Sequence, residues 1–165
     1  MQSAFGLAKR LQISEHSGGE LLKSYFDRFS KISEFYDEVK ELADRTTYTF
    51  SMFKRSRRLP LVKSSNAHVR NAAYRMVVNH VMQATSADLL KMNMIMLYDL
   101  RFKDGYDIKF KVPSHDGTVS FCGPTVPKDE ICEEIKKRFT INLKDIPMLC
   151  NVKTGPSWGD LIEWK

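Results

Sequence analysis

The feature that most constrains the fold is a pair of alternating segments joined through an Asp-Gly dipeptide. Apolar side chains occupy every second position in residues 106–112, and residues 118–122 repeat the pattern. This period of two is expected when one face of a strand is buried and the other is in water. Asp116-Gly117 favours a tight turn, because Gly accepts a positive φ and Asp tolerates one. The sequence therefore predicts a β-hairpin with residues 114–117 at its tip.

Two interpretations of this tip stay open at this point. A solvent-facing turn accounts for Asp116 and Gly117, and it is the favoured interpretation when the tip is taken alone. A turn does not explain why His115 stands beside Asp116. The second interpretation is a cation site, because a carboxylate held at a hairpin tip is well placed to bind a hard cation such as Mg²⁺. The choice depends on the rest of the chain.

The chain is basic, and its cations are clustered. It has 165 residues, with 26 Lys and Arg against 20 Asp and Glu, which gives a formal net charge of +6. This length suits one domain or a fragment of something larger, and the charge favours a polyanionic partner. Lys54-Arg55-Ser56-Arg57-Arg58 places four cations in five positions. Such a run could contact phosphate groups or serve as a nuclear-localisation signal. The apolar residues that follow it would anchor the run to a folded domain, which favours phosphate contact.

The cysteines and the hydropathy indicate a cytoplasmic protein with no membrane span. Cys122, Cys132 and Cys150 are widely spaced and odd in number, which suggests reduced thiols that act as small core residues. No leader is recognised, and no apolar run approaches the roughly 20 residues that a membrane span needs. We expect the nucleoid, or a host cytoplasm for a viral protein, as the location.

The remaining segments alternate between helical and extended patterns. We expect a helical stretch up to about Arg10, a polar connection over residues 14–19, and amphipathic helices from Glu20 with a break near Ser30-Lys31. Further along we expect a strand over residues 46–53, a helix that ends near Gln83 and a second helix after residues 84–86. A helix that begins at Pro127 and a short strand over residues 147–152 should follow.

The helix that ends near Gln83 carries a row of polar side chains. Arg75, Asn79 and Gln83 are spaced by four, so they lie on one face of the helix. An ordinary wet surface would also explain such a row. However, Arg, Asn and Gln are the side chains best suited to pairing with base edges and sugars, since each offers donors at a defined reach.

In chain order, these segments resemble the C-terminal part of a family A DNA polymerase over almost the whole chain. Ser3-Ala4-Phe5-Gly6 resembles the segment after the fingers helix, and residues 53–60 resemble the basic loop that ends in Leu-Pro. Residues 75–88 are similar to the Arg…Asn…Gln-Gly-Thr-Ala-Ala-Asp helix pair. Ser114-His115-Asp116 resembles the palm hairpin, and Gly155-Pro156-Ser157-Trp158 resembles the Gly-x-x-Trp close.

The resemblance implies an α+β fold: a palm-type antiparallel sheet with a catalytic β-hairpin, packed on helices, and N-terminal helices from the fingers. Residues 1–46 would be the helical end of the fingers subdomain, and residues 47–165 the C-terminal part of the palm. Asp116 matches one of two carboxylates that hold a pair of Mg²⁺ ions, and His115 matches a residue near the primer terminus.

The resemblance also implies DNA contacts and substrates. Arg75, Asn79 and Gln83 match residues that contact the minor groove of the primer-template, and Arg55 and Arg57 would lie near backbone phosphate. The substrates would be primer-template DNA and deoxynucleoside triphosphates.

The chain departs from the family pattern at several positions. Gly117 replaces the acid that usually follows the hairpin Asp, Ala84 replaces a Gly, and Ser56 interrupts the arginine cluster. The second metal-binding Asp and the fingers helix lie upstream of the point that matches Met1. One carboxylate cannot assemble a two-metal site.

The leading hypothesis is therefore the C-terminal part of a split family A polymerase, inactive alone and completed by a complementary N-terminal fragment. Such a piece should expose apolar faces that its complement covers. Three alternatives stay open: a degenerate remnant that binds DNA or a partner protein without catalysis, an unrelated basic adaptor protein, and a deliberately shortened chain.

Overall fold

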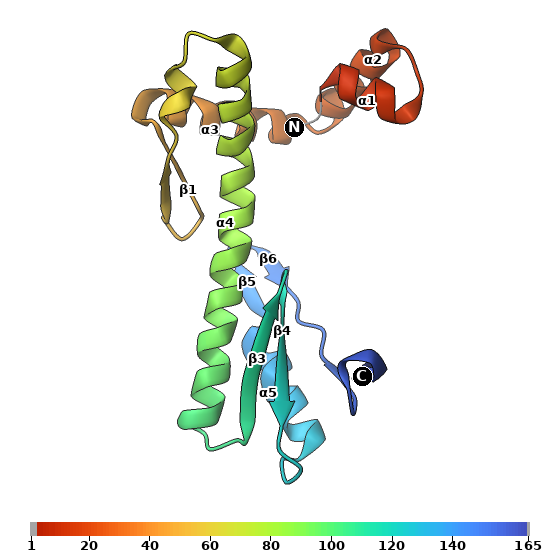
Figure 1. Ribbon diagram of the computed structural model, residues 1–165, viewed down its shortest axis with the longest axis vertical. Helices are drawn as coiled ribbons and strands as arrows, with labels where there is room; N and C mark the ends of the chain where they lie inside the picture. Colours follow the sequence, from red (N-terminus) through yellow and green to blue (C-terminus); the bar gives the residue numbers. More distant parts are fainter. Residues whose placement is uncertain (1–2, 165) are drawn as a thin grey trace. The chain divides into compact units, whose positions relative to one another are not determined.

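The computed structural model describes residues 3–164, which form two compact units, Met1–Thr85 and Ser86–Lys165 (Figure 1). Helix α4 (Ala67–Phe102) runs through the boundary between them. The chain is α+β, as predicted, with long helices and four two-stranded antiparallel sheets in the described part. None of the helices over residues 3–164 is both long enough and apolar enough to cross a membrane.

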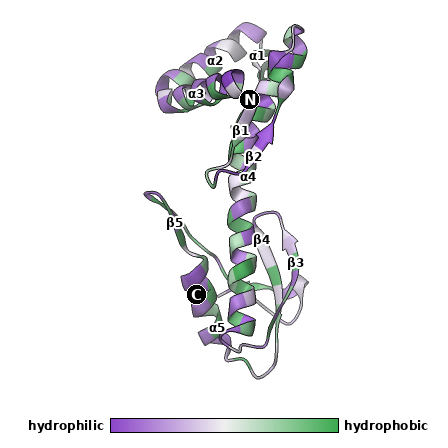
Figure 2. Cartoon of the chain, turned by 90° about the vertical axis from the view of Figure 1, so that its left-hand side faces the viewer, coloured by the Kyte–Doolittle hydropathy of each residue, from purple (hydrophilic) through white to green (hydrophobic). Residues whose placement is uncertain are grey.

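The first unit consists of helices and one hairpin. Its elements before α4 are α1 (Ala4–Leu11), α2 (Glu15–Arg28), α3 (Ser30–Thr46), β1 (Tyr48–Phe50), β2 (Ser56–Arg58) and the 3-10 helix η1 (Pro60–Lys63). Most residues of α2 and α3 are hydrophilic (Figure 2). The core is small: Ala43, Leu59, Val62, Ala73 and Val77 are buried together.

The polar segment around Gly18 is helical, so the predicted connection over residues 14–19 is wrong. Ser14 caps α2 by accepting a hydrogen bond from the Ser17 N–H at 3.1 Å. Gly18 is buried against α1, where a Cβ would lie 2.8 Å from the Ala4 carbonyl oxygen. The glycine therefore permits close packing of two helices and does not mark a loop. The predicted break near Ser30 is confirmed, since α2 ends at Arg28 and α3 begins at Ser30.

Helix α4 is continuous over 36 residues, so the predicted break at residues 84–86 is also wrong. The Thr85 hydroxyl donates to the Val81 carbonyl at 2.6 Å, one turn earlier. Ser and Thr in a helix interior satisfy their hydroxyls in this way. Ala84 and Thr85 are both buried, so tertiary contacts hold this stretch in the helix.

The second unit packs short strands and one helix against the second part of α4. Its further elements are β3 (Ile108–Ser114), β4 (Gly117–Cys122), α5 (Lys128–Phe139), β5 (Ile141–Leu143), β6 (Ile146–Met148), β7 (Lys153–Thr154), the 3-10 helix η2 (Trp158–Asp160) and β8 (Ile162–Glu163). The core joins α4, β3 and α5 through Leu97, Leu100, Ile108, Ile131, Cys132 and Phe139. The strand predicted at residues 147–152 is only partly present, because β6 ends at Met148.

The predicted β3–β4 hairpin is confirmed, but it does not have one uniformly buried face. Phe110 pairs with Ser120, and the next pair joins Val112 to Val119, so a bulge lies between Phe110 and Val112. Residues that pair across the hairpin share a face of the sheet, and side chains along a strand alternate between the two faces. Because Lys111 is an extra residue at the bulge, Val112 lies on the same face as Val119 and Phe121, and not on the face of Phe110. Ile108 is buried, whereas Phe121 is 55% exposed.

Candidate functional site

The polar row on α4 is exposed over its whole length. Arg75, Asn79 and Gln83 all face solvent, while Ala73 and Val77, on the opposite side of the helix, are fully buried. None of the three polar side chains makes a hydrogen bond or ion pair within residues 3–164. Their donors are therefore available to a ligand outside the described chain.

Two neighbours of this row were missed from the sequence. Asn71 is exposed and lies one turn before Arg75, so it extends the row at the same spacing of four. Met82 is 65% exposed and lies beside Asn79 on the helix surface. The spacing alone could have found Asn71, whereas the exposure of an apolar Met82 carries no signal in the sequence.

The second part of the basic run forms strand β2 of a hairpin, whereas Lys54 lies in the loop that joins β1 to β2. β1 and β2 pair antiparallel, with Thr49 opposite Arg57 and Phe50 opposite Ser56. The loop is short: the Ser51 N–H donates to the Arg55 carbonyl at 2.9 Å, and Lys54 adopts φ 65°. A three-residue loop with its last residue in the left-handed region is a common hairpin connection.

Hydrogen bonds described for residues 3–164 fix this hairpin to α4. The Thr49 hydroxyl donates to the Val77 carbonyl at 3.2 Å, the Met52 N–H donates to the Thr85 hydroxyl at 3.0 Å, and the Arg55 guanidinium donates to the Ala84 carbonyl at 3.0 Å. Arg55 therefore has a structural role in the fold. Arg57 is exposed on β2.

His115 and Asp116 form the two-residue turn between β3 and β4. Ser114 pairs with Gly117, and both turn residues are exposed. The positive φ, 52°, falls on His115; φ of Gly117 lies outside the left-handed region. The Asp-Gly pattern thus predicts the turn, but the positive φ falls on His115 and not on Asp116 or Gly117. A histidine in this conformation is uncommon, although less so than for most side chains.

Asp116 fits Mg²⁺ as a single ligand. A carboxylate oxygen is the ligand atom that Mg²⁺ prefers, and Asp116 is exposed at the tip. In residues 3–164, however, no group of three or more His, Cys, Asp or Glu side chains could hold a metal ion.

The cysteines offer no second site. Cys132 is buried as predicted, and burial raises the pKa of its thiol, which keeps it protonated and unreactive. Cys122 is exposed, contrary to the prediction of a core residue, and Cys150 is half-buried. All three are free thiols.

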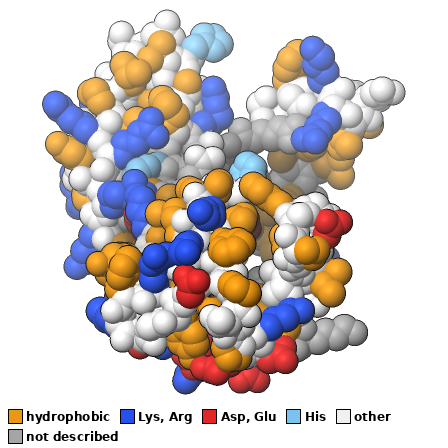
Figure 3. All heavy atoms as spheres, turned by 60° about the horizontal axis from the view of Figure 1, so that its bottom comes forward, with side chains coloured by type: hydrophobic (Ala, Val, Ile, Leu, Met, Phe, Trp, Pro, Cys, Tyr) orange, Lys and Arg blue, Asp and Glu red, His pale blue; other side chains and the backbone are white. Residues whose placement is uncertain are grey.

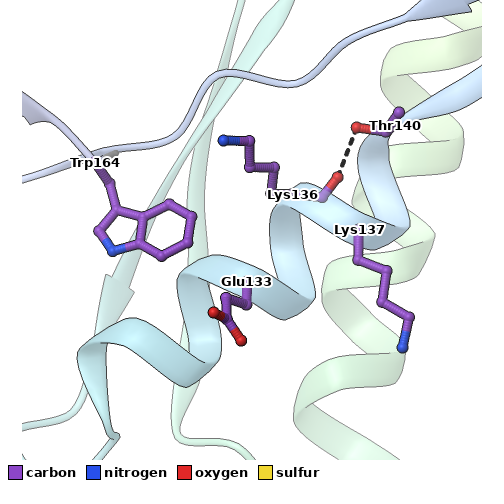
Figure 4. A pocket seen from close by; sticks show the side chains of 5 residues that line it. All are labelled: Glu133, Lys136, Lys137, Thr140 and Trp164. Atoms are coloured by element: carbon purple, nitrogen blue, oxygen red, sulfur yellow. Dashed lines mark hydrogen bonds between the residues drawn. The ribbon is translucent and has the colours of Figure 1, made fainter.

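An open depression of about 500 Å³ lies beside α5 and contains none of the predicted site residues. It is lined by Glu133, Lys136, Lys137, Thr140 and Trp164 (Figure 4). The Lys136 ammonium lies 5.4 Å from the centre of the Trp164 ring, whose N–H donates to Asp129. These contacts hold the end of the chain on α5, so the depression has a structural explanation.

Comparison with known proteins places these features in a family. Residues 1–160 match the model of DNA polymerase family A. DNA polymerase I of Streptococcus pneumoniae serotype 4 is 33% identical over 161 residues, which cover 94% of this chain and 18% of that protein. DNA polymerase I of Mycobacterium tuberculosis is 38% identical over 95 residues, 58% of this chain and 10% of that protein.

A solved structure shows the same fold. The chain is similar to the POL domain of Pol1 from M. smegmatis in complex with DNA primer-template and dNTP, with a TM-score of 0.82 and 29% identity, covering 88% of this chain and 26% of that one. The chain spans less than a fifth of the length of the S. pneumoniae polymerase. With the family match over nearly its whole length, this chain belongs to DNA polymerase family A.

Proposed function

We propose that this chain supplies the end of the fingers (residues 1–46) and the C-terminal palm (residues 47–165) of a DNA-directed DNA polymerase. Joined to a complementary N-terminal polymerase fragment, it would add deoxynucleotides to a primer-template. The observation that carries the proposal is a family A chain in which the helix row and the hairpin Asp116 are both exposed to solvent.

The β3–β4 hairpin would provide half of the catalytic centre. Asp116 would hold Mg²⁺ through its carboxylate, while His115 would lie near the primer terminus. When bound, the metal pair would activate the primer 3′-hydroxyl and neutralise charge on the leaving pyrophosphate. Gly117 has no side chain to contribute, so the second carboxylate would come from the complementary fragment.

The α4 row would test the geometry of the newly formed base pair. Minor-groove acceptors occupy similar places in all correct pairs, so donors from Arg75, Asn79 and Gln83 can contact them without reading sequence. The exposure of these three side chains supports this role. Arg55 and Arg57 would contact backbone phosphate.

Exposed apolar surface supports a need for a complementary fragment. On the second part of α4, Ile95, Tyr98 and Phe102 are spaced by three and four and are each about 60% exposed. Hydrophobic side chains are also prominent on the face shown in Figure 3. Apolar stripes of this kind are usually covered by another surface.

The proposal is tested by complementation. The chain would be co-expressed with a family A fragment that carries the thumb, the first palm motif and the fingers helix, and the purified complex would be assayed for primer extension with Mg²⁺. We expect extension by the complex and none by either part alone. A complex that forms but never extends a primer would contradict the proposal.

One alternative is favoured by specific observations. The chain has Gly117 in place of an acid and Ala84 in place of a glycine. Such replacements are expected in a degenerate polymerase remnant that binds DNA or a partner protein without catalysis. That function predicts salt-dependent binding of duplex DNA by the chain and a complex without activity.

A further inference from the structure

The β1–β2 hairpin has a second face that the fold does not use. Thr49 points to α4 and is fully buried, so its neighbours Tyr48 and Phe50 lie on the opposite face. Each of these aromatic residues is 37% exposed. Their ring centres are 6.4 Å apart, and their planes differ by 29°, so the rings present two nearly parallel surfaces.

Cationic side chains surround these rings. Arg58 lies directly opposite Tyr48 in the register of the hairpin and is exposed on the same face. Lys54 and Arg57 are exposed nearby in the sequence, within the run of four cations in five positions. No acidic residue occurs between Thr46 and Tyr74, so the charge of this hairpin is not neutralised from its own segment.

The face is also held rigidly. The hydrogen bonds from Thr49, Met52 and Arg55 fix both the strand and the loop to α4. A rigid aromatic surface loses little conformational entropy when it binds a ligand. The same rings on a mobile loop would bind more weakly.

We propose that the outer face of this hairpin, formed by Tyr48, Phe50 and Arg58, binds single-stranded DNA by stacking of unpaired bases. Aromatic rings on a sheet accept bases of any sequence, because every base has a π-face, and adjacent cations bind the phosphates. A duplex presents its bases stacked on each other, so it cannot use the rings. The charge of the hairpin favours DNA over an apolar protein surface as the occupant.

This binding goes beyond the proposed polymerase function and does not depend on it. Primer extension requires the duplex contacts and the catalytic hairpin, whereas the outer face of β1–β2 would retain an unpaired strand. The two can therefore fail separately in experiments.

The test measures binding of a fluorescent 15-mer of thymidylate to the 165-residue chain by anisotropy, with a hairpin duplex of equal charge as the second probe. We expect Tyr48→Ala and Phe50→Ala each to weaken single-strand binding about tenfold while duplex binding changes less than twofold. Tyr48→Phe keeps the ring and should bind like the wild type. Phe5→Ala, at a ring 63% exposed on α1, is the matched control.

Two further variants separate stacking from charge and from folding. Phe50→Leu keeps an apolar strand residue without a ring, so it should fold normally and lose single-strand affinity as Phe50→Ala does. Arg58→Ala should reduce the slope of log affinity against log salt by about 0.7, the contribution of one phosphate contact in a single strand.

The proposal is overturned if Tyr48→Ala and Phe50→Leu bind the 15-mer like the wild type, or if they lose single-strand and duplex binding equally. A second result would also overturn the proposal: the wild type does not bind the 15-mer and sediments as a dimer, and Phe50→Leu dissociates that dimer. The outer face would then be an interface between two copies of the chain. Loss of 15-mer binding with unchanged extension of a primer-template that carries only a short template overhang supports it.

Discussion

The two hairpins with functional assignments differ in how the fold holds them. The β1–β2 hairpin is short and is fixed to α4 through Thr49, Met52 and Arg55. The β3–β4 hairpin is longer and contains a bulge, and within residues 3–164 no hydrogen bond or ion pair involves the side chains of His115 and Asp116 at its tip.

The difference shows which function each hairpin can perform alone. A surface that binds DNA needs rigid donors and rings, and those are complete in the first unit. A two-metal centre needs several carboxylates around the same ions, and the tip of β3–β4 offers Asp116 only. Changes near β1–β2 should therefore alter stability and KM, and changes in β3–β4 should alter kcat.

After loss of the Asp116 carboxylate itself, the largest of these effects is expected from deletion of Lys111. After the deletion Phe110 and Val112 are adjacent, and so are their partners Ser120 and Val119, so the ladder becomes regular. The hairpin should remain folded, but its bend and the direction of its tip should change. We expect kcat of the complemented enzyme to fall on the order of 100-fold with KM unchanged.

Lys111→Ala is the control for this deletion, because it keeps the residue count and the bulge. Single-turnover primer extension measures the effect on chemistry. Wild-type rates for the deletion would show that the bulge does not orient Asp116.

Loss of the Thr85 hydroxyl should destabilise the other hairpin. Thr85→Val removes the acceptor of the partly buried Met52 N–H, which should cost about 2 kcal/mol of unfolding free energy. Thr140→Val is the matched control: that hydroxyl also donates to a carbonyl one turn earlier, but it is exposed, so the cost should stay within about 0.5 kcal/mol. Urea denaturation compares them, and equal costs would refute the role of this contact.

The α4 row should affect binding more than chemistry. Arg75→Ala and Asn79→Ala should each lower kcat/KM of the complemented enzyme about tenfold, mainly through KM for primer-template, because each loses hydrogen bonds to DNA. Asn142→Ala, at an exposed amide on β5, should be silent. An unchanged KM in the Arg75 and Asn79 variants would remove the row from the DNA interface.

The smallest effect concerns a contact between α3 and α4. The Tyr74 hydroxyl donates to Asp44 at 2.7 Å, and this hydrogen bond raises the pKa of Tyr74. Tyr74→Phe should cost about 1 kcal/mol at pH 8. Because the pKa is raised on folding, the stabilisation is complete below the ordinary tyrosine pKa of about 10 and is lost as the pH rises through the folded value.

Urea denaturation of both proteins at pH 8 and above pH 10 checks this sign. The difference between the wild type and Tyr74→Phe should shrink at the higher pH. A difference that grows with pH would contradict the assignment of the hydrogen bond.

Local patterns predicted much of the fold and the family. The alternation in residues 106–122 predicted the β3–β4 hairpin, and the spacing of four predicted that Arg75, Asn79 and Gln83 share an exposed helix face. The misses have a common physical cause. The residues around Gly18 favour a loop, yet Gly18 packs against Ala4. The pattern at Thr85 favours a helix break, yet the Thr85 hydroxyl donates to a carbonyl of the same helix and accepts from the Met52 N–H.

The bulge in β3 was missed for a related reason. The alternation of Ile108, Phe110 and Val112 implies one face, and only the pairing with β4 reveals that Val112 belongs to the other. Contacts between segments distant in sequence decided each of these cases.

The most direct test of the central claim is primer extension by the complemented complex with Asp116→Ala. Asp145→Ala, at an exposed carboxylate in the turn between β5 and β6, is the matched control. The account predicts that Asp116→Ala binds primer-template normally but extends it at least about 1000-fold more slowly, while Asp145→Ala extends like the wild type. Extension by Asp116→Ala at the wild-type rate would contradict it.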